Sequence, residues 1–244
     1  MPQWLTTFAL VMAGAVPSLL WLFYYLHKDS HPEPRSALVR VFLMGIIIAP
    51  LAVGAQWAFV KVFSIATTPY FYFWAALVEE AVKLLAVWFI ILNSEEFDEP
   101  VDAMVYMITA SLGFAAIENI LFLDKSFAIN GLAYTGQLLL LRAVGATLLH
   151  ALAGAITGYT LALAWFHYHH LKKLLLGGLL LASSFHFAFN LLIISSQDSG
   201  AHYLYAMALL ASMAMLIQIL FKKVQERSPL LALVTSDSRA KIAT

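Results

Sequence analysis

The stretch Tyr70–Leu92, Y-F-Y-F-W-A-A-L-V-E-E-A-V-K-L-L-A-V-W-F-I-I-L, is long and apolar enough to cross a lipid bilayer as one helix. Near its middle it carries three charged side chains, Glu79, Glu80 and Lys83. One charge at the centre of a bilayer costs about 2.5–3.5 kcal/mol on insertion scales. These side chains must therefore face protein or enclosed water, and this requirement predicts a functional site within the membrane.

The composition of the whole chain agrees with a membrane location. Of its 244 residues, 62% are hydrophobic and only 11% are charged, whereas soluble domains contain about 25% charged residues. The formal net charge is zero and no basic block is present, so the sequence offers nothing that would bind nucleic acid. The chain has no cysteine, which excludes disulfides, thiolate metal sites and cysteine nucleophiles.

The apolar runs predict an all-α fold, a polytopic transmembrane helix bundle. Lipid cannot hydrogen-bond exposed backbone groups, and the runs far exceed the ~10 residues of a barrel strand. We expect about seven spans, or eight if the segment 131–165 contains a short helix and a separate span. The expected spans are 3–26, 37–60, 70–92, 101–123, 137–165, 174–195 and 202–221. We expect residues 1–222 to form a single transmembrane domain with an intramembrane site, and residues 223–244 to form a polar cytoplasmic tail.

The distribution of lysine and arginine predicts the orientation. The loops and span ends on one side of the predicted bundle carry ten lysine and arginine residues, whereas those on the opposite side carry only Lys61 and Lys125. Basic residues are enriched on the cytoplasmic side of membrane proteins, which predicts an outside N-terminus, a cytoplasmic C-terminus and a location in the cell (inner) membrane. The basic side carries Lys28, Arg35, Arg40, Lys172, Lys173, Lys222, Lys223, Arg227, Arg239 and Lys241.

Several further polar side chains lie within the predicted spans. They are Glu118, Asn119, Arg142, His150, His186 and Asn190. Residues three or four apart are neighbours on a helix face, which places Lys83 beside Glu79 and Glu80, and His186 beside Asn190. At about 1.5 Å per residue, the glutamates and histidines of four helices fall at a similar depth in the outer half of the bilayer. Independent packing residues have no reason to converge on one level, so we expect one common site.

Each of these residues also has a structural interpretation. A Glu–Lys pair one turn apart is often a buried ion pair that fixes helix packing, and a single intramembrane histidine more often packs than binds a ligand. Arg142 lies near a helix end, where it could extend to the interface or pair with Asp124. The combination of three carboxylates and two imidazoles at one depth favours a catalytic or binding site.

Five segments of the chain, and a weaker sixth, form a pattern in a fixed order. The five are E-E-A-V-K (79–83), E-F-D-E-P-V-D-A-M-V-Y (96–106), G-F-A-A-I-E-N (113–119), H-A-L-A-G-A-I-T-G-Y (150–159) and H-F-A-F-N (186–190), and the weaker one is H-P-E-P (31–34). In this order and helix placement, they resemble the PrsW family of intramembrane proteases, which is related to the type II CAAX prenyl endopeptidases and the bacteriocin-immunity-type membrane proteins. Phe114-x-x-x-Glu118 stands where those relatives have F-x-x-x-H.

The resemblance implies an intramembrane endopeptidase that cleaves a single-pass membrane protein near the outer side of the bilayer. In this family the implied reaction is the first cut of an anti-sigma factor during an envelope-stress response. The implied partners are that substrate and the lipid bilayer. The expected catalytic residues are Glu79, Glu80, Glu118, His150 and His186, with Lys83, Asn119 and Asn190 in supporting roles.

Two mechanisms use these same residues. In the first, which we favour narrowly and which needs no cofactor, Glu79 or Glu80 activates a water molecule, His186 and Asn190 donate to the oxyanion, and His150 and Glu118 hold the water. In the second, His150, His186 and a glutamate, taken as Glu118, bind Zn²⁺ while another glutamate acts as the base.

Two further classes of function use buried glutamate and histidine. A proton- or ion-coupled transporter builds its relays from such residues, although the sequence shows no inverted repeat and no pair of Gly/Pro-broken helices. A non-catalytic membrane scaffold that binds a single-pass helix is the other alternative.

Overall fold

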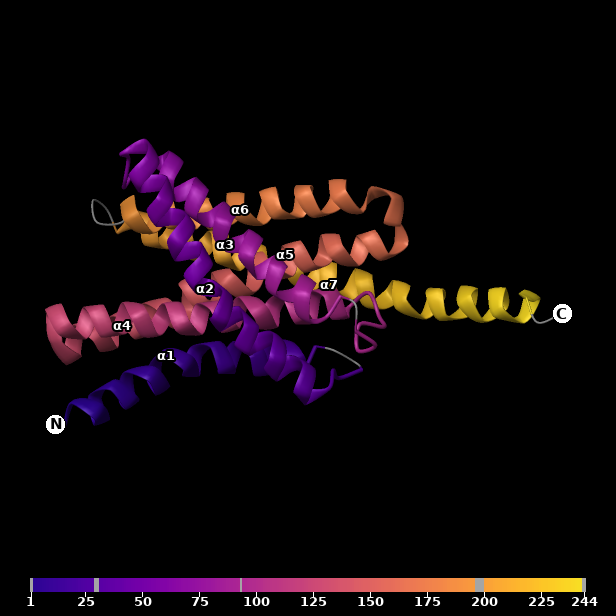
Figure 1. Ribbon diagram of the computed structural model, residues 1–244, viewed down its shortest axis with the longest axis horizontal. Coiled ribbons are helices and arrows are strands. Elements are labelled where there is room, and N and C mark those ends of the chain that lie inside the picture. The colour runs from indigo at the N-terminus through magenta and orange to yellow at the C-terminus, as the bar shows by residue number, and fades with distance from the viewer. Residues whose placement is uncertain (1, 29–30, 93, 196–199, 243–244) are drawn as a thin grey trace.

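The protein is a bundle of long α-helices, seen in a computed structural model that describes residues 2–28, 31–92, 94–195 and 200–242 (Figure 1). Within these ranges there is no β-strand, which confirms the all-α prediction. The helices are α1 (Gln3–Leu26), α2 (Arg35–Phe63), α3 (Pro69–Ile90), α4 (Asp102–Val144), α5 (Ala146–Phe166), the short 3₁₀ helix η1 (Tyr168–His170), α6 (Leu171–Ser195) and α7 (Ala201–Ile242).

The surface of the bundle is that of a protein surrounded by lipid. Many side chains that point outward from the helices are large and apolar, among them Ile47, Trp57, Leu140 and Leu204, each at least 64% exposed. Five stretches of the described chain are long and apolar enough to cross a membrane. The protein is therefore a multi-pass membrane protein, and the number of spans stays a prediction.

The number of these stretches differs from the seven expected spans for two reasons. One stretch, Asp102–Phe166, contains both α4 and α5. The helix α3 is not among the five, and it is the helix that carries Glu79, Glu80 and Lys83. Its charges are therefore what distinguish α3 from an ordinary membrane helix.

The segment 131–165 contains a short helix followed by a long one. Gly131, at φ 75° and ψ −175°, interrupts α4, so the chain reverses there and residues 132–144 form a second, short helix. A positive φ is the conformation that glycine adopts without steric cost. The short helix lies back along the first part of α4, since the Thr135 hydroxyl donates to Ser126 Oγ at 3.2 Å and Arg142 reaches Asn119. Of the two forms expected for this segment, the chain adopts the short helix plus α5.

The first part of α4 forms the centre of the bundle. The residues from Asp102 to Ala116 are all buried, and α4 packs against α5, α1 and α2. Small residues allow this packing: a Cβ atom on Gly154 of α5 would lie 2.9 Å from the backbone oxygen of Met107 and 2.2 Å from Ser111 Oγ. The glycine therefore lets α5 approach α4 closely, as the stripe of small residues after His150 predicts.

The H-P-E-P segment and the loop before α4 meet at the opposite end of α4 from Gly131. The Tyr106 hydroxyl donates a short hydrogen bond to Glu33, and Arg40 Nη2 lies 2.5 Å from Glu96 Oε1. Hydrogen bonds from Ser94 and Arg40 lower the pKa of the Glu96 carboxyl. Asp102, at the first turn of α4, accepts the backbone N–H groups of Asp98 and Glu99 at 3.0 and 2.7 Å. The contacts of Tyr106 and Arg40 join the H-P-E-P region at the start of α2 to the region 96–106, which contains the loop before α4. Neither of these two segments contains an expected catalytic residue.

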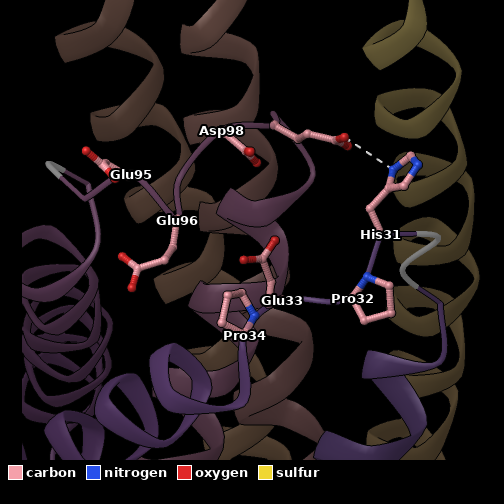
Figure 2. A pocket seen from close by; sticks show the side chains of 8 residues that line it. His31, Pro32, Glu33, Pro34, Glu95, Glu96 and Asp98 are labelled. Atoms are coloured by element: carbon pink, nitrogen blue, oxygen red, sulfur yellow. Dashed lines mark ion pairs between the residues drawn. The ribbon is translucent and has the colours of Figure 1, made fainter.

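Figure 2 shows the acidic pocket, of about 670 Å³, that these two segments enclose. None of the expected catalytic residues lines it, so we do not assign the reaction to this pocket. Its walls are His31, Pro32, Glu33, Pro34, Glu95, Glu96, Asp98 and Glu99.

The two ends of the chain lie at opposite ends of the long axis of the molecule (Figure 1). The helix α7 continues to Ile242, so the backbone of most of the expected tail is helical. The division into a membrane domain of residues 1–222 and a cytoplasmic tail of residues 223–244 stays a prediction, as does the orientation of the two termini.

Candidate active site

The structure brings the five expected catalytic side chains into one connected cluster. They come from four helices and are separated by up to 107 positions in the sequence. Every link between them is a contact between polar atoms or ring edges. The residues are Glu79 and Glu80 of α3, Glu118 of α4, His150 of α5 and His186 of α6.

Glu80 is fixed between two donors. Its Oε1 accepts from Lys83 Nζ at 2.7 Å and lies 2.8 Å from His186 Nδ1. The side chains of Glu80 and Lys83 are both 0% exposed. Through this one oxygen Glu80 holds Lys83 and His186 in place, while its Oε2 is buried without a hydrogen-bond partner in the described protein.

Lys83 also determines the tautomer of His150. The ammonium group has only donors, and its Nζ lies 2.6 Å from His150 Nδ1. That nitrogen must therefore be the acceptor, which puts the proton of a neutral His150 on Nε2, 2.9 Å from Glu118 Oε2. The ring of Phe114 lies 4.8 Å from Lys83 Nζ, so the aromatic residue of the F-x-x-x-E segment provides a cation–π contact for this lysine.

Glu79 and His186 face each other across a gap. His186 donates from Nδ1 to Glu80, so a neutral ring presents an unprotonated Nε2, which lies 3.6 Å from Glu79 Oε2. Both atoms are then acceptors. Glu79 Oε2 is also buried and has no hydrogen-bond partner within the described protein. The pair therefore suits a group that brings protons or positive charge, such as a water molecule or a metal ion.

Glu118 is held by a residue to which the sequence assigned no catalytic role. Arg142 donates from Nη2 to Glu118 Oε2 at 2.7 Å and from Nε to Asn119 Oδ1 at 2.8 Å. Of the two possibilities that the sequence offered for Arg142, extension to the interface or a pair with Asp124, the structure shows neither; its partners are Glu118 and Asn119. Only the reversal of the chain at Gly131 places residue 142 beside residue 118, and no local spacing in the sequence signals that contact.

The two supporting asparagines differ in their contacts. Asn119 is buried and donates from Nδ2 to Thr147 Oγ1 at 2.9 Å, so it joins α4 to the start of α5. Asn190 is half-buried one turn after His186, on the face that the four-residue spacing predicts. Within the described part of the chain, its side chain makes no hydrogen bond to the five clustered residues. The oxyanion role expected for Asn190 stays a prediction.

Three of the clustered residues could hold a metal ion. Glu79, His150 and His186 each offer a ligand atom, and these atoms lie within 4.8 Å of one another. The sequence favoured Glu118 as the carboxylate, but the structure places Glu79 in this group. Two histidines and one glutamate form a known ligand set of catalytic zinc, and the unpartnered Oε2 of Glu79 fits such a role. His150 would have to release Lys83 or Glu118 to take part.

Two carboxylates of the cluster are partly exposed. The side chain of Glu118 is 25% exposed and that of Glu79 is 11% exposed, whereas those of Glu80 and Lys83 are fully buried. A partner can therefore approach Glu79 and Glu118 but not the ion pair behind them. The arrangement offers a carboxylate with one free oxygen, imidazoles of fixed orientation and a neutralised interior, which is what hydrolysis of a bond in a poorly hydrated site requires.

Comparisons with known proteins identify the family of the chain. A sequence model described as the PrsW family of intramembrane metalloproteases matches residues 33–217. Protease PrsW of Oceanobacillus iheyensis is 35% identical over 191 residues, covering 76% of this chain and 83% of that protein. Protease PrsW of Geobacillus kaustophilus is 32% identical, covering 79% and 83% of the two chains. Protease PrsW of Bacillus subtilis is 31% identical, covering 65% and 70%. No solved structure matches the chain.

The matched region contains all five clustered residues, from Glu79 to His186, and the relatives are matched over most of their own length. On these grounds the chain belongs to the PrsW family of intramembrane proteases.

Proposed function

We propose that this protein hydrolyses a peptide bond of a single-pass membrane protein, with Glu79 as the general base. The observation that carries the proposal is the free, buried Oε2 of Glu79, which faces His186 Nε2 at 3.6 Å. Oε2 of Glu80 is also buried without a hydrogen-bond partner in the described protein. Glu80 suits the role less well because its side chain is 0% exposed, against 11% for Glu79, and because its Oε1 forms the ion pair with Lys83.

In the proposed reaction, Glu79 Oε2 takes a proton from a water molecule as the water oxygen attacks the carbonyl carbon of the peptide. The tetrahedral intermediate then collapses, the C–N bond breaks, and Glu79 returns the proton to the leaving amine. We assign donation to the oxyanion to Asn190 and to a protonated His186, both from the H-x-x-x-N segment. Lys83 and Glu80 keep the two imidazoles in place during these steps.

A metal ion held by Glu79, His150 and His186 would act as a Lewis acid on the peptide carbonyl. We favour catalysis without metal because the Lys83 ammonium contacts His150 Nδ1 at 2.6 Å. A second cation beside that ammonium would be repelled in a medium of low dielectric constant. Glu79 Oε2 also cannot bind a metal and act as the free base at the same time.

The substrate that we propose is a single-pass anti-sigma factor, cut near the outer face of the membrane. The family resemblance supports this substrate, and the depth expected for Glu79, Glu118 and His186 supports the position of the cut. Glu79 and Glu118 are the partly exposed carboxylates of the cluster, which supports the approach of a single helix to these two side chains.

The test is cleavage by the purified protein reconstituted in lipid vesicles with a candidate single-pass substrate. We expect the wild type to release a defined fragment. We expect Glu79→Gln, which keeps the shape but cannot take up the proton, to be folded and inactive. Full cleavage by Glu79→Gln would exclude Glu79 as the base, and cleavage by neither protein of any single-pass substrate would contradict the proposed activity.

A further inference from the structure

We infer that Gln56 of α2 is a positioning residue that orients the Glu79 carboxylate. This inference rests on the proposed function, since it assigns the residue that prepares Glu79 to act as a base. Gln56 belongs to none of the segments that resemble the family, and no motif or spacing in the sequence places it in the site.

The contact is a single hydrogen bond between two membrane helices. Gln56 Nε2 donates to Glu79 Oε1 at 2.9 Å. The other oxygen of the same carboxylate, Oε2, is buried without a hydrogen-bond partner in the described protein and faces His186. The amide therefore fixes one oxygen and leaves the reactive one directed into the cluster.

The position of Gln56 in its helix is unusual for a purely structural residue. Between Val41 and Val60 of α2, all side chains except that of Gln56 are apolar or aromatic. An amide in such a helix must find a hydrogen-bond partner, because lipid offers none. Gln56 is half-buried and its partner is a carboxylate of the candidate active site, so the amide serves that carboxylate.

A second set of contacts already holds the two helices together. The rings of Phe59 and Trp74 stack with centroids 5.4 Å apart, and Trp74 Nε1 lies 3.5 Å from the backbone oxygen of Ala55. These contacts lie within one turn of Gln56 on α2. They fix the distance between α2 and α3, so the amide of Gln56 is free to determine the rotation of the Glu79 carboxylate.

Loss of the amide should affect the chemical step rather than substrate binding. Without it, the carboxylate of Glu79 can rotate and Oε2 is directed at the reacting water for a smaller fraction of the time. We expect Gln56→Met, which is similar in size but has no donor, to lower kcat about tenfold, the effect of one lost hydrogen bond to a charged group. The KM should stay within about twofold, because Gln56 contacts Glu79 and the remote binding energy is unchanged.

The experiment compares wild type, Gln56→Met and Trp74→Phe in the reconstituted cleavage assay, with thermal unfolding in detergent measured in parallel. Trp74→Phe removes the other polar contact between α2 and α3 and keeps the aromatic packing, so it controls for loosening of the two helices. We expect it to lower the Tm slightly and to leave kcat unchanged. An unchanged kcat in Gln56→Met, or equal losses of kcat in both variants, would overturn the inference.

A double-mutant cycle separates this inference from the proposed activity. The Tm of Gln56→Met is compared in the wild-type and Glu79→Leu backgrounds. If Gln56 bonds to Glu79, the Tm loss is smaller in the second background, since its partner is already absent. Equal losses in the two backgrounds would overturn the contact itself. An inactive wild type with a coupled pair would instead contradict the proposed protease activity.

Discussion

Arg142 donates to Glu118 at 2.7 Å although 23 residues and a reversal of the chain at Gly131 lie between them. The same carboxylate oxygen contacts Nε2 of His150 at 2.9 Å. The short helix 132–144 thus connects directly to the imidazole of the candidate site. Because Glu118 Oε2 already contacts both Arg142 and His150, Glu118 orients His150 rather than acting as a general base.

Removal of the Arg142 guanidinium should leave the Glu118 carboxylate, and with it the His150 imidazole, less well oriented. We predict that Arg142→Gln lowers cleavage at least tenfold and also lowers the Tm, because Glu118 then loses a charged partner inside the bundle. Arg142→Lys should retain part of the activity, since an ammonium can reach Glu118 or Asn119 but not both with the geometry of the guanidinium. Lys125→Gln, which changes an exposed charge on the same helix, is the control. Wild-type rates in Arg142→Gln would show that the contact is not required.

The Glu80–Lys83 pair should contribute to stability as well as to activity. Both side chains are 0% exposed, and a buried ion pair that loses one partner costs about 3–5 kcal/mol. We predict that Glu80→Gln lowers the free energy of unfolding by about this amount and abolishes cleavage. The double variant Glu80→Gln/Lys83→Met should recover much of the stability, because no unpaired charge remains, and it should remain inactive. Thermal or chemical unfolding in detergent measures the first effect. A stable, active Glu80→Gln protein would contradict both.

The dependence on metal distinguishes the two mechanisms. We predict that cleavage by the reconstituted protein continues after treatment with a zinc chelator and that elemental analysis of the purified protein finds much less than one zinc per chain. The reason is the Lys83 ammonium, 2.6 Å from His150 Nδ1. Loss of activity on chelation, with recovery on addition of zinc but not magnesium, would establish Glu79, His150 and His186 as a metal site instead.

The expected orientation can be tested with single cysteines, since the chain has none of its own. Phe122 lies one turn beyond Glu118 and is 46% exposed, and Ile193 lies two turns beyond His186. We predict that Phe122→Cys and Ile193→Cys react with a membrane-impermeant thiol reagent added outside the cell. Lys172→Cys, at the predicted inner end of α6, should react only after the membrane is permeabilised. The reverse pattern would place the active site in the inner half of the bilayer.

The sequence by itself determined the class of the protein and the chemistry that it carries. The length of the apolar runs requires membrane helices, and the cost of charge in lipid singles out Glu79, Glu80 and Lys83. The four-residue spacing puts His186 and Asn190 on one face. These properties follow from the sequence because each depends on residues within one helix, or on the solvent around it.

Only the tertiary structure decided which contacts, and therefore which role, each polar residue of the candidate site has. It brings His186 to Glu80, leaves one oxygen of Glu79 without a partner, turns the chain at Gly131 so that Arg142 reaches Glu118, and brings Gln56 to Glu79. Such contacts depend on how helices cross and rotate against each other. That geometry is set by the packing of whole helix faces, such as the close approach of α5 to α4 at Gly154, and no spacing within a single helix encodes it.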